Sequence, residues 1–349
     1  MSYEYERAVA AGGALRLHLN ENTAGCSPGV IAALQRLTRQ NVAIYPDYET
    51  VVAACAARLG VQPECLLLTN GLDDGILATA VSALRNSPLE EPFEAIVVVP
   101  AFDMYAACAD AVGGRVVEVP LGPEFVFPVR EVIQAVTTRT RAIFLTNPNN
   151  PTGGLIPRQD VVSIARAASE ALVFVDEAYA DFSGETLIGD PAFLTLENVV
   201  IGRTFAKAYG LAGLRAGALV AAPKTLAPLR RTVPPYTLNV AAAVALPAAF
   251  EDLAYYEWYL AQVRESRRLL CATLDRLDVK YWPSTANFVL ARFGTDLERV
   301  IGGLAARQVA IRDRSGDPGC QGCARITTGV VEHTTRCVEA LEEVLCGAA

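Results

Sequence analysis

The sequence is poor in histidine, methionine and tryptophan, with two residues of each among 349. Two histidines leave little room for acid–base chemistry based on imidazole, so a lysine, a tyrosine or a cofactor has to carry any proton transfer. His18 and His333 also lack the spacing of metal ligands. We therefore expect neither a histidine-based catalytic centre nor a metal site.

Long apolar runs are absent as well, although 52% of the residues are hydrophobic. The longest apolar stretches are strand-length pieces such as residues 95–99, whereas a membrane-spanning helix needs about 20 apolar residues. The first residues lack the basic and then apolar layout of a secretion signal. The sequence therefore predicts a cytoplasmic location and no membrane partner.

An excess of basic charge is also lacking. The chain has 30 basic and 38 acidic residues, a net charge of −8 and no stripe of Lys and Arg, so nucleic acid is not an expected partner. Its nine cysteines are an odd number without regular spacing, which argues against a disulfide framework. The single Cys320-x-x-Cys323 motif lacks the second ligand pair that a zinc site needs.

Residues 60–220 alternate short β-branched runs with helix-like stretches, a pattern typical of a mostly parallel sheet sandwiched by helices. The predicted fold class is α/β, with a large domain over residues 30–230. Residues 1–29 and 231–349 would form a smaller α+β domain with an N-terminal arm, because long helical stretches follow residue 225. The predicted strands of the large sheet are 65–69, 95–99, 115–119, 142–146, 171–175, 199–201 and 216–220.

Polar motifs follow several of these strands. Such sheets bind ligands where the carboxyl ends of the strands meet loops, so we expect the motifs to form one site. Asp176 ends a buried apolar strand, and its carboxylate should need a cationic partner such as a protonated pyridine nitrogen, or should cap the next helix. The turn at 147–153 is, taken alone, more typical of a structural turn than of a site.

Lys207 lies in a loop that contains almost no other charge. A lysine in an apolar loop can act as an amine nucleophile toward an aldehyde. Arg215, eight residues further on, is placed to pair with a phosphate. A solvated surface lysine is the alternative, and the uncharged flanks argue against it.

In these motifs the chain resembles the aspartate-aminotransferase fold family (fold type I) of enzymes that depend on pyridoxal phosphate. The resemblance covers nearly the whole chain. Its motifs are Asn20-Glu21-Asn22, Tyr45-Pro46-Asp47, Gly71-Leu72-Asp73-Asp74, Pro100-Ala101-Phe102-Asp103-Met104-Tyr105, Pro148-Asn149-Asn150-Pro151-Thr152-Gly153, Asp176-Glu177-Ala178-Tyr179, Arg203-Thr204-Phe205-Ala206-Lys207-Ala208, Ala286-Asn287-Phe288, Arg312-Asp313 and Arg325-Ile326-Thr327.

The resemblance implies that pyridoxal 5′-phosphate is held as an imine on Lys207, which then moves a proton between the Cα of the substrate and C4′ of the cofactor. Asp176 would keep the pyridine nitrogen protonated. Tyr179 would be the third catalytic residue, with Lys207 and Asp176. The further contacts that it implies are Leu72, Asp73, Thr204 and Arg215 at the phosphate, Phe102 and Asn150 at the ring, Tyr45 from the second subunit of a homodimer, and Arg325, Arg312, Asn20 and Asn150 at the substrate.

Within this family the chain looks most like members that transaminate L-histidinol phosphate with 2-oxoglutarate in histidine biosynthesis. Two guanidinium groups suit a dianionic phosphate better than one carboxylate. Relatives that act on aromatic amino acids or decarboxylate threonine phosphate are the alternatives within the family. A nucleotide-binding reductase is disfavoured because residues 69–75 lack three spaced glycines, and a binding protein without catalysis is disfavoured because Lys207 and Asp176 are present.

Three positions depart from the family pattern. Ala206 stands where a serine hydroxyl commonly meets the phosphate, and the loss of such a bond costs about 1 kcal/mol. Thr23 replaces a common proline, and Leu72 replaces a usually small residue. The arm before Asn20 is also shorter than usual. We expect Ala206 to weaken cofactor affinity, and we expect the departures together to bear on the choice of substrate more than on the cofactor.

Overall fold

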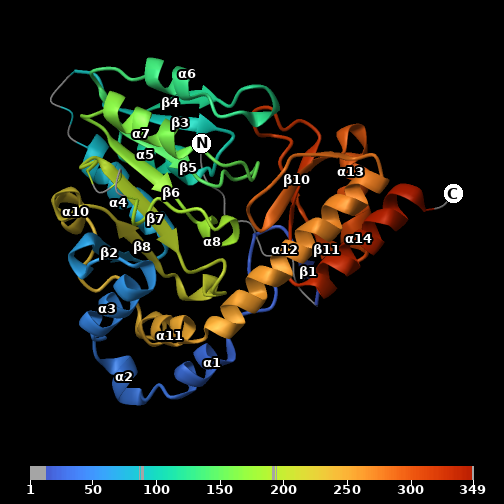
Figure 1. Ribbon diagram of the computed structural model, residues 1–349, viewed down its shortest axis with the longest axis horizontal. Helices are drawn as coiled ribbons and strands as arrows, with labels where there is room; N and C mark the ends of the chain where they lie inside the picture. Colours follow the sequence, from blue (N-terminus) through green and yellow to red (C-terminus); the bar gives the residue numbers. More distant parts are fainter. Residues whose placement is uncertain (1–12, 86, 88–89, 191–192, 194, 348–349) are drawn as a thin grey trace.

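The computed structural model describes residues 13–85, 87, 90–190, 193 and 195–347. The first twelve residues of the predicted N-terminal arm lie outside this range. Figure 1 shows a large layered part and a smaller part, joined by the long helix α12 (Leu253–Arg276). Among the described residues, no helix is both long enough and apolar enough to cross a membrane.

The large part is built on a seven-stranded sheet in the order β2-β8-β7-β6-β5-β3-β4. Only β8 runs antiparallel to its neighbours. Each predicted strand is present with shifts of a few residues at its ends, and the predicted α/β fold class is confirmed. The strands are β2 (Leu66–Thr69), β3 (Glu94–Val99), β4 (Arg115–Pro120), β5 (Thr140–Thr146), β6 (Leu172–Asp176), β7 (Val199–Thr204) and β8 (Gly217–Val220).

The central strands are buried on both faces, which explains why they are continuous apolar runs rather than alternating ones. Ile143, Val173 and Val175 have no exposed surface, and helix α4 lies across β2, β5, β6, β7 and β8. The helices of this part are α1 (Pro28–Gln35), α2 (Arg39–Ala43), α3 (Tyr48–Leu59), α4 (Leu72–Leu84), α5 (Met104–Ala111), α6 (Val129–Gln134), α7 (Arg158–Ala167), α8 (Ala180–Ser183), α10 (Pro223–Arg230) and α11 (Val240–Glu251).

The small part has its own apolar core, which includes Leu270, Val289 and Leu341. It contains an antiparallel sheet in the order β12-β13-β10-β9 and a short parallel pair, β1-β11. Helices α13 and α14 pack on each other and α14 packs on α12. These elements are β1 (Leu15–Arg16), β9 (Lys280–Tyr281), β10 (Phe288–Arg292), β11 (Val309–Ala310), β12 (Arg312–Asp313), β13 (Cys323–Thr327), α13 (Leu297–Ala306) and α14 (Val331–Cys346).

The predicted domain division at residues 230 and 231 stays a prediction. The packing argues for a boundary further along the chain, because α11 contacts α1 and α3 and its buried side chains belong to the larger core. Helix α11 is apolar around most of its surface, and such a helix needs a core on several sides. We therefore favour a boundary at α12.

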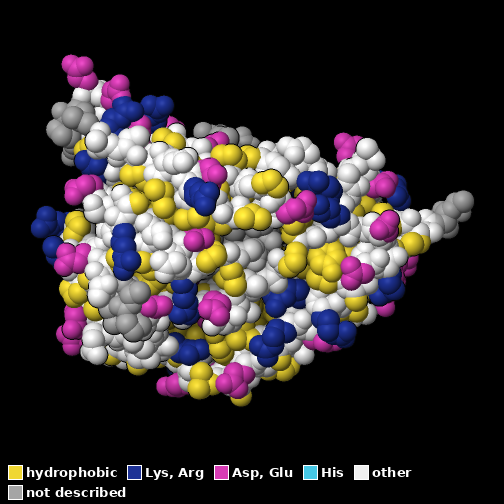
Figure 2. All heavy atoms as spheres, turned by 45° about the horizontal axis from the view of Figure 1, so that its top comes forward, with side chains coloured by type: hydrophobic (Ala, Val, Ile, Leu, Met, Phe, Trp, Pro, Cys, Tyr) yellow, Lys and Arg dark blue, Asp and Glu magenta, His cyan; other side chains and the backbone are white. Residues whose placement is uncertain are grey.

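The surface carries both signs of charge. Figure 2 shows Lys and Arg side chains interspersed with Asp and Glu over the visible face, without a continuous basic stripe. The chain as a whole has a net charge of −8. The visible face therefore lacks the continuous basic surface that binds the backbone of a nucleic acid.

Candidate active site

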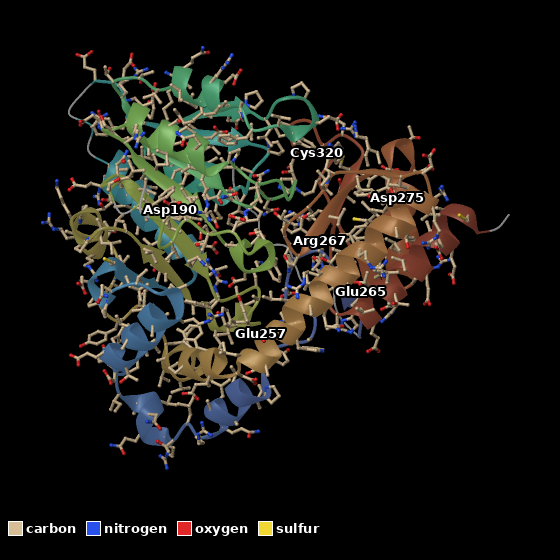
Figure 3. All side chains as sticks on the ribbon, in the orientation of Figure 1. Asp190, Glu257, Glu265, Arg267, Asp275 and Cys320 are labelled. Carbon is tan, nitrogen blue, oxygen red and sulfur yellow. The ribbon has the colours of Figure 1, made fainter. Side chains whose placement is uncertain are left out.

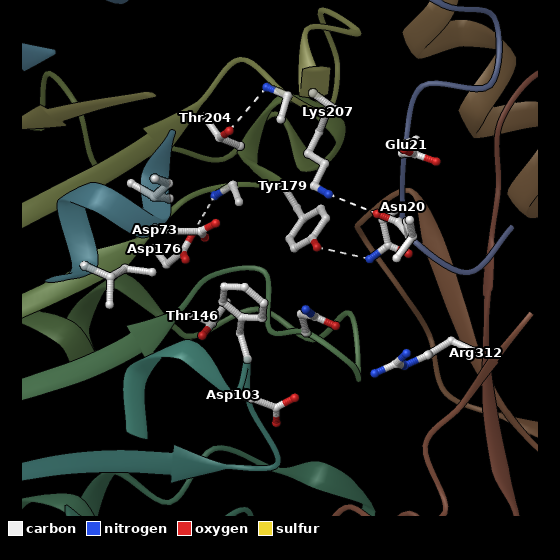
Figure 4. Close-up of a pocket in the computed structure, with 18 of the residues that line it drawn as sticks. Asn20, Glu21, Asp73, Asp103, Thr146, Asp176, Tyr179, Thr204, Lys207 and Arg312 are labelled. Atoms are coloured by element: carbon white, nitrogen blue, oxygen red, sulfur yellow. Dashed lines mark hydrogen bonds between the residues drawn. The ribbon is translucent and has the colours of Figure 1, made fainter. Parts of the chain in front are cut away.

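A cavity of about 410 Å³ lies where the carboxyl ends of the large sheet face the small sheet. Every residue predicted for the site lines this cavity except Tyr45. In Figure 4, Thr204, Asp73 and Asp176 lie on one side of the cavity and Arg312 lies on the other. The site residues predicted from the sequence that line it are Asn20, Leu72, Asp73, Phe102, Asn150, Asp176, Tyr179, Thr204, Lys207, Arg215, Arg312 and Arg325.

Lys207 points into the cavity from the loop that follows β7 (Figure 4). Its Nζ donates a 3.0 Å hydrogen bond to the carbonyl oxygen of Leu19 and lies 6.0 Å from the ring centroid of Tyr179. Within the described part of the chain, no carboxylate forms an ion pair or a hydrogen bond with this amine. A carbonyl bond of this kind is easily exchanged, so the amine is available to a ligand in the cavity.

Asp176 lies at the end of β6 and is 4% exposed. Its Oδ1 accepts a 2.8 Å bond from the backbone N–H of Ala178, and its Oδ2 accepts a 2.6 Å bond from the Tyr105 hydroxyl. Burial raises the pKa of Asp176 to about 6, against the opposing effect of these two bonds. A buried carboxylate without a cation favours a positively charged partner, which a protonated pyridine nitrogen would provide.

The N-terminus of α4 forms a cradle for an anion. Its N-cap is Gly71, at φ +79°, which makes no side-chain capping bond. A Cβ at Gly71 would come within 2.6 Å of Arg215 Nη2, and one at Gly217 within 2.8 Å of Leu72 N. Only glycine leaves room there for the helix start, Arg215 and a bound group. Free N–H groups at a helix start, with an arginine beside them, form a phosphate site.

Arg215 closes this cradle on the solvent side. Its Nη2 lies 2.9 Å from Asp73 Oδ2, and both side chains are 45% exposed. An exposed pair of this kind contributes little to stability. The guanidinium is therefore held near the helix start at low energetic cost and can turn to a phosphate.

Tyr179 and Asn150 lie between the cradle and the small sheet. The Tyr179 hydroxyl accepts a 3.0 Å bond from Asn20 Nδ2, and the Asn150 side-chain oxygen accepts a 2.5 Å bond from Arg325 Nη1. The Phe102 ring packs edge-on against Tyr105, with ring centroids 5.9 Å apart. A flat ring bound in the cavity would therefore meet the apolar face of Phe102 and the polar groups of Tyr179 and Asn150.

The residues present fit pyridoxal phosphate. The uncapped helix start with its two glycines matches a phosphate, the buried Asp176 matches a protonated ring nitrogen, and the Lys207 amine matches an aldehyde. The three features lie in one cavity. The role of each residue toward the cofactor stays a prediction.

The side of the cavity formed by the small sheet is cationic. Arg325 on β13 is 6% exposed, and its Nη2 donates a 2.6 Å bond to the carbonyl oxygen of His18. Burial lowers the pKa of Arg325 to about 10. Arg312 on β12 lines the same side. An anionic substrate group would offset the burial cost of the Arg325 guanidinium.

Tyr45 lies outside the cavity of its own chain. Its side chain is 72% exposed and stacks on Tyr236 with ring centroids 4.0 Å apart. Val42 and Ile44 beside it are also more than half exposed. A contribution of Tyr45 to the site of a second subunit stays a prediction.

Several lining residues were missed from the sequence. Tyr105 is fully buried and bonds to Asp176, and Thr146 donates a 2.9 Å bond to the Tyr105 hydroxyl. Arg314 lines the cavity beside the predicted arginines, two residues after Arg312. The spacing of two residues between Arg312 and Arg314 could have predicted that both side chains lie on one face of a strand. The contact between Tyr105 and Asp176 could not be predicted in this way, because it depends on strand order. The other lining residues not predicted are His18, Leu19, Glu21, Ile76, Asp103, Ala178, Ala206, Ala212 and Gly213.

The CxxC motif lies away from the cavity. Cys320 and Cys323 are buried free cysteines that pack with Trp282 and Leu290, at the joint between the two parts (Figure 3). Burial raises the pKa of Cys320 to about 12, which makes its thiol unreactive. Within the described part of the chain, no group of three or more His, Cys, Asp or Glu residues could hold a metal ion.

Ala206 lines the cavity next to Lys207, and its N–H donates a 3.2 Å bond to Thr204 Oγ1. The Ala206→Ser variant is expected to bind pyridoxal phosphate about three- to tenfold more tightly, because one hydroxyl bond to a phosphate contributes about 1 kcal/mol. Titration of the apoprotein with the cofactor, followed by absorbance, measures the change. Unchanged affinity would mean that the other phosphate contacts already suffice.

The comparisons with known proteins concern nearly the whole chain. The family model for aminotransferase class I and II matches residues 13–341. The histidinol-phosphate aminotransferases of Moorella thermoacetica and Symbiobacterium thermophilum are each 33% identical to the chain. The alignments cover 98% of this chain in both cases, and 88% and 93% of those relatives, respectively.

A solved structure supports the same fold. The histidinol-phosphate aminotransferase of Sinorhizobium meliloti, solved in complex with pyridoxal 5′-phosphate, matches with a TM-score of 0.85. The match covers 96% of this chain and 92% of that chain at 24% sequence identity. This likeness shows that the two chains share their fold.

Proposed function

Because the chain belongs to the aminotransferase class I and II family, we propose that it transfers the amino group of L-histidinol phosphate to 2-oxoglutarate. The enzyme is an aminotransferase that depends on pyridoxal phosphate. The products would be imidazole acetol phosphate and L-glutamate, in histidine biosynthesis. The names of the relatives at 33% identity support this donor.

The observation that carries the choice of substrate is the cationic side of the cavity. Arg312 and Arg325 face the cavity from neighbouring strands of the small sheet. A phosphate dianion can accept several charge-assisted hydrogen bonds from such a pair. The carboxylates of 2-oxoglutarate could use the same guanidinium groups in the second half of the reaction.

The side chains would divide the work as follows. When bound, pyridoxal phosphate supplies an aldehyde that takes up the amino group and a protonated ring that accepts electron density. Asp176 holds the ring nitrogen protonated through its buried carboxylate. Lys207 would hold the aldehyde of the bound cofactor, and its amine would accept the proton released from the donor Cα once a donor amine has taken its place.

The remaining groups would orient the reactants. Leu72 and Asp73 present backbone N–H groups to the phosphate, with Thr204 and Arg215 beside them. Tyr179 and Asn150 fix the polar edge of the ring. Phe102 covers one ring face and excludes water from it. Asn20 holds Tyr179 through its side-chain amide, and it would contact the substrate.

Two rival reactions keep the same fold and cofactor. Relatives of this kind could act on aromatic amino acids or decarboxylate threonine phosphate. The bond that lies perpendicular to the ring is the one that breaks, so the pose of the donor decides between transamination and decarboxylation. The cationic side of the cavity favours a phosphorylated donor over an aromatic amino acid.

A panel of donors on the purified holoenzyme tests the proposal. L-Histidinol phosphate should bleach the absorbance of the aldehyde form, and 2-oxoglutarate should restore it with formation of glutamate. Aromatic amino acids should react at least about tenfold more slowly, because they lack the dianion. Failure of L-histidinol phosphate to bleach the absorbance would remove it as the donor.

We also infer that the enzyme acts as a homodimer in which Tyr45 reaches the phosphate of the partner's cofactor. The exposed apolar group around Tyr45, with Val42 and Ile44, supports an interface. The cytoplasmic location expected from the sequence stays a prediction.

Mixed dimers test the shared site. Subunits with Tyr45→Ala and subunits with Lys207→Ala should each show low activity alone. Random mixing should restore about one quarter of the wild-type activity, because half of the dimers would then hold one intact site. No gain on mixing, with hybrid dimers demonstrated by mass, would contradict a shared site.

A further inference from the structure

A third arginine belongs to the cationic side of the cavity. Arg314 lines the cavity with Arg312 and Arg325, and it is only 7% exposed. Antiparallel pairing places Arg312 directly opposite Arg325, and the ladder continues with a 2.9 Å bond from Arg314 N to the carbonyl oxygen of Cys323. Alternate residues of a strand share a face, so the three arginines project to the same side. Asp313, between two of them, is exposed.

This arrangement is unfavourable without a ligand. Like charges directly opposite each other on one face of a sheet destabilise it, and buried charges need partners. Arg314 has one carboxylate partner, Asp317, at 2.5 Å, and its Nη2 is 3.5 Å from the carbonyl oxygen of Ala101. The Nε atoms of Arg314 and Arg325 are buried and have no hydrogen-bond partner among the described residues.

The charge balance favours a dianion. Four acidic side chains line this cavity. Glu21 pairs with Arg16 and Asp73 pairs with Arg215, each at 2.9 Å, Asp103 is exposed, and Asp176 lies across the cavity at the end of β6. Asp317, whose side chain is 19% exposed, is the carboxylate that pairs with Arg314, so the three arginines and Asp317 together carry an excess of two positive charges. A phosphate monoester carries about two negative charges at neutral pH, whereas a carboxylate carries one.

We propose that Arg314, held by Asp317, binds the phosphate of the amino donor and makes the site selective for a dianion over a carboxylate. The selectivity rests on the proposed function, because it requires a phosphorylated donor. The binding of an anion by the three arginines does not require it. Arg314 thus adds a specificity-determining residue to the two arginines expected from the sequence.

The first test compares donors with and without the phosphate. In the Arg314→Gln holoenzyme, KM for L-histidinol phosphate should rise about 10- to 100-fold with little change in kcat, as expected for the loss of one charged hydrogen-bond donor. The kcat/KM for L-histidinol, which lacks the phosphate, should change less than about threefold. Arg314→Lys should give an intermediate KM, because the charge remains without the planar fork.

Arg292→Gln is the matched control. Arg292 lies on β10, stacks over Trp282 and donates a 3.0 Å bond to the carbonyl oxygen of Gly319, in the same loop as Asp317. It does not line the cavity. Its replacement disturbs the loop without removing an arginine from the cavity, and it should leave the preference for the phosphorylated donor unchanged. An equal loss for both donors in Arg314→Gln, or no loss, would overturn the inference.

The second test does not depend on turnover. Calorimetric titration of the holoenzyme with inorganic phosphate probes the dianion site, because bound pyridoxal phosphate fills the cradle at α4. Arg314→Gln should bind inorganic phosphate about tenfold more weakly than wild type. If L-histidinol phosphate is not a donor, the proposed function fails, but this titration still tests whether Arg314 binds a phosphate dianion. Equal phosphate affinity in variant and wild type, or no binding to wild type, would refute its role.

Discussion

Lys207→Ala is expected to lower kcat about 10⁴-fold or more, because the variant loses both the covalent anchor and the proton carrier. The absorbance of the bound aldehyde form should shift to that of the free cofactor. Steady-state assays with excess pyridoxal phosphate separate loss of catalysis from loss of binding. The melting temperature of the apoprotein should change little, since the hydrogen bond of the Lys207 amine among the described residues is to the carbonyl oxygen of Leu19.

The small number of lysines allows each one to be tested separately as the site of the imine. The chain has three lysines, Lys207, Lys224 and Lys280. Lys224 pairs with Glu197 and Lys280 pairs with Glu124, and neither lines the cavity. Reduction with borohydride should label the peptide that contains Lys207, and Lys224→Ala should keep full activity. A label on either other lysine, or an active Lys207→Ala enzyme, would contradict the assignment.

The position of Lys207 illustrates what the sequence could predict. Each strand of the large sheet is a short apolar run, and a parallel sheet brings the ends of such runs to one edge. Asp176 and Thr204 end strands β6 and β7, and Asn150 follows β5, so their convergence follows from the pattern alone. The family motifs then added the chemistry that the pattern could not supply.

Contacts that depend on strand order or on packing could not be read in this way. Tyr105 bonds to Asp176 across 71 positions because β3, β5 and β6 are neighbours in the sheet. The reversed direction of β8 and the place of α11 in the larger core have the same origin. Arg314 differs from these, since its alternation with Arg312 was visible in the sequence.

Asp176 links the chemistry of the site to the stability of the apoprotein. Burial raises its pKa in the folded apoprotein from an ordinary 3.8 to about 6. Between these values the folded state keeps a proton that the unfolded state has lost, so the unfolding free energy falls as pH rises from about 4 to about 6. The decrease from this group is at most about 3 kcal/mol.

Urea unfolding of the apoprotein between pH 4 and 7 measures this effect. The Asp176→Asn variant keeps a neutral group at every pH and should not show this part of the decrease. The unfolding free energy of the variant should therefore increase relative to that of wild type as pH rises. Parallel stability profiles for the two apoproteins would show that Asp176 titrates normally in the fold.

The same substitution is expected to lower kcat/KM about 10²- to 10³-fold in the holoenzyme, because a neutral amide cannot compensate a protonated ring nitrogen in a buried site. Tyr105→Phe is the matched control. It removes the 2.6 Å bond to Asp176 but leaves the carboxylate, so the loss should stay below about tenfold. Asp176→Asn is thus expected to raise the stability of the apoprotein near neutral pH but to lower the activity of the holoenzyme. Asp176 destabilises the empty fold near neutral pH and becomes favourable when a cation binds beside it. A variant more stable than wild type without cofactor but much slower with it would be the combined signature of this role.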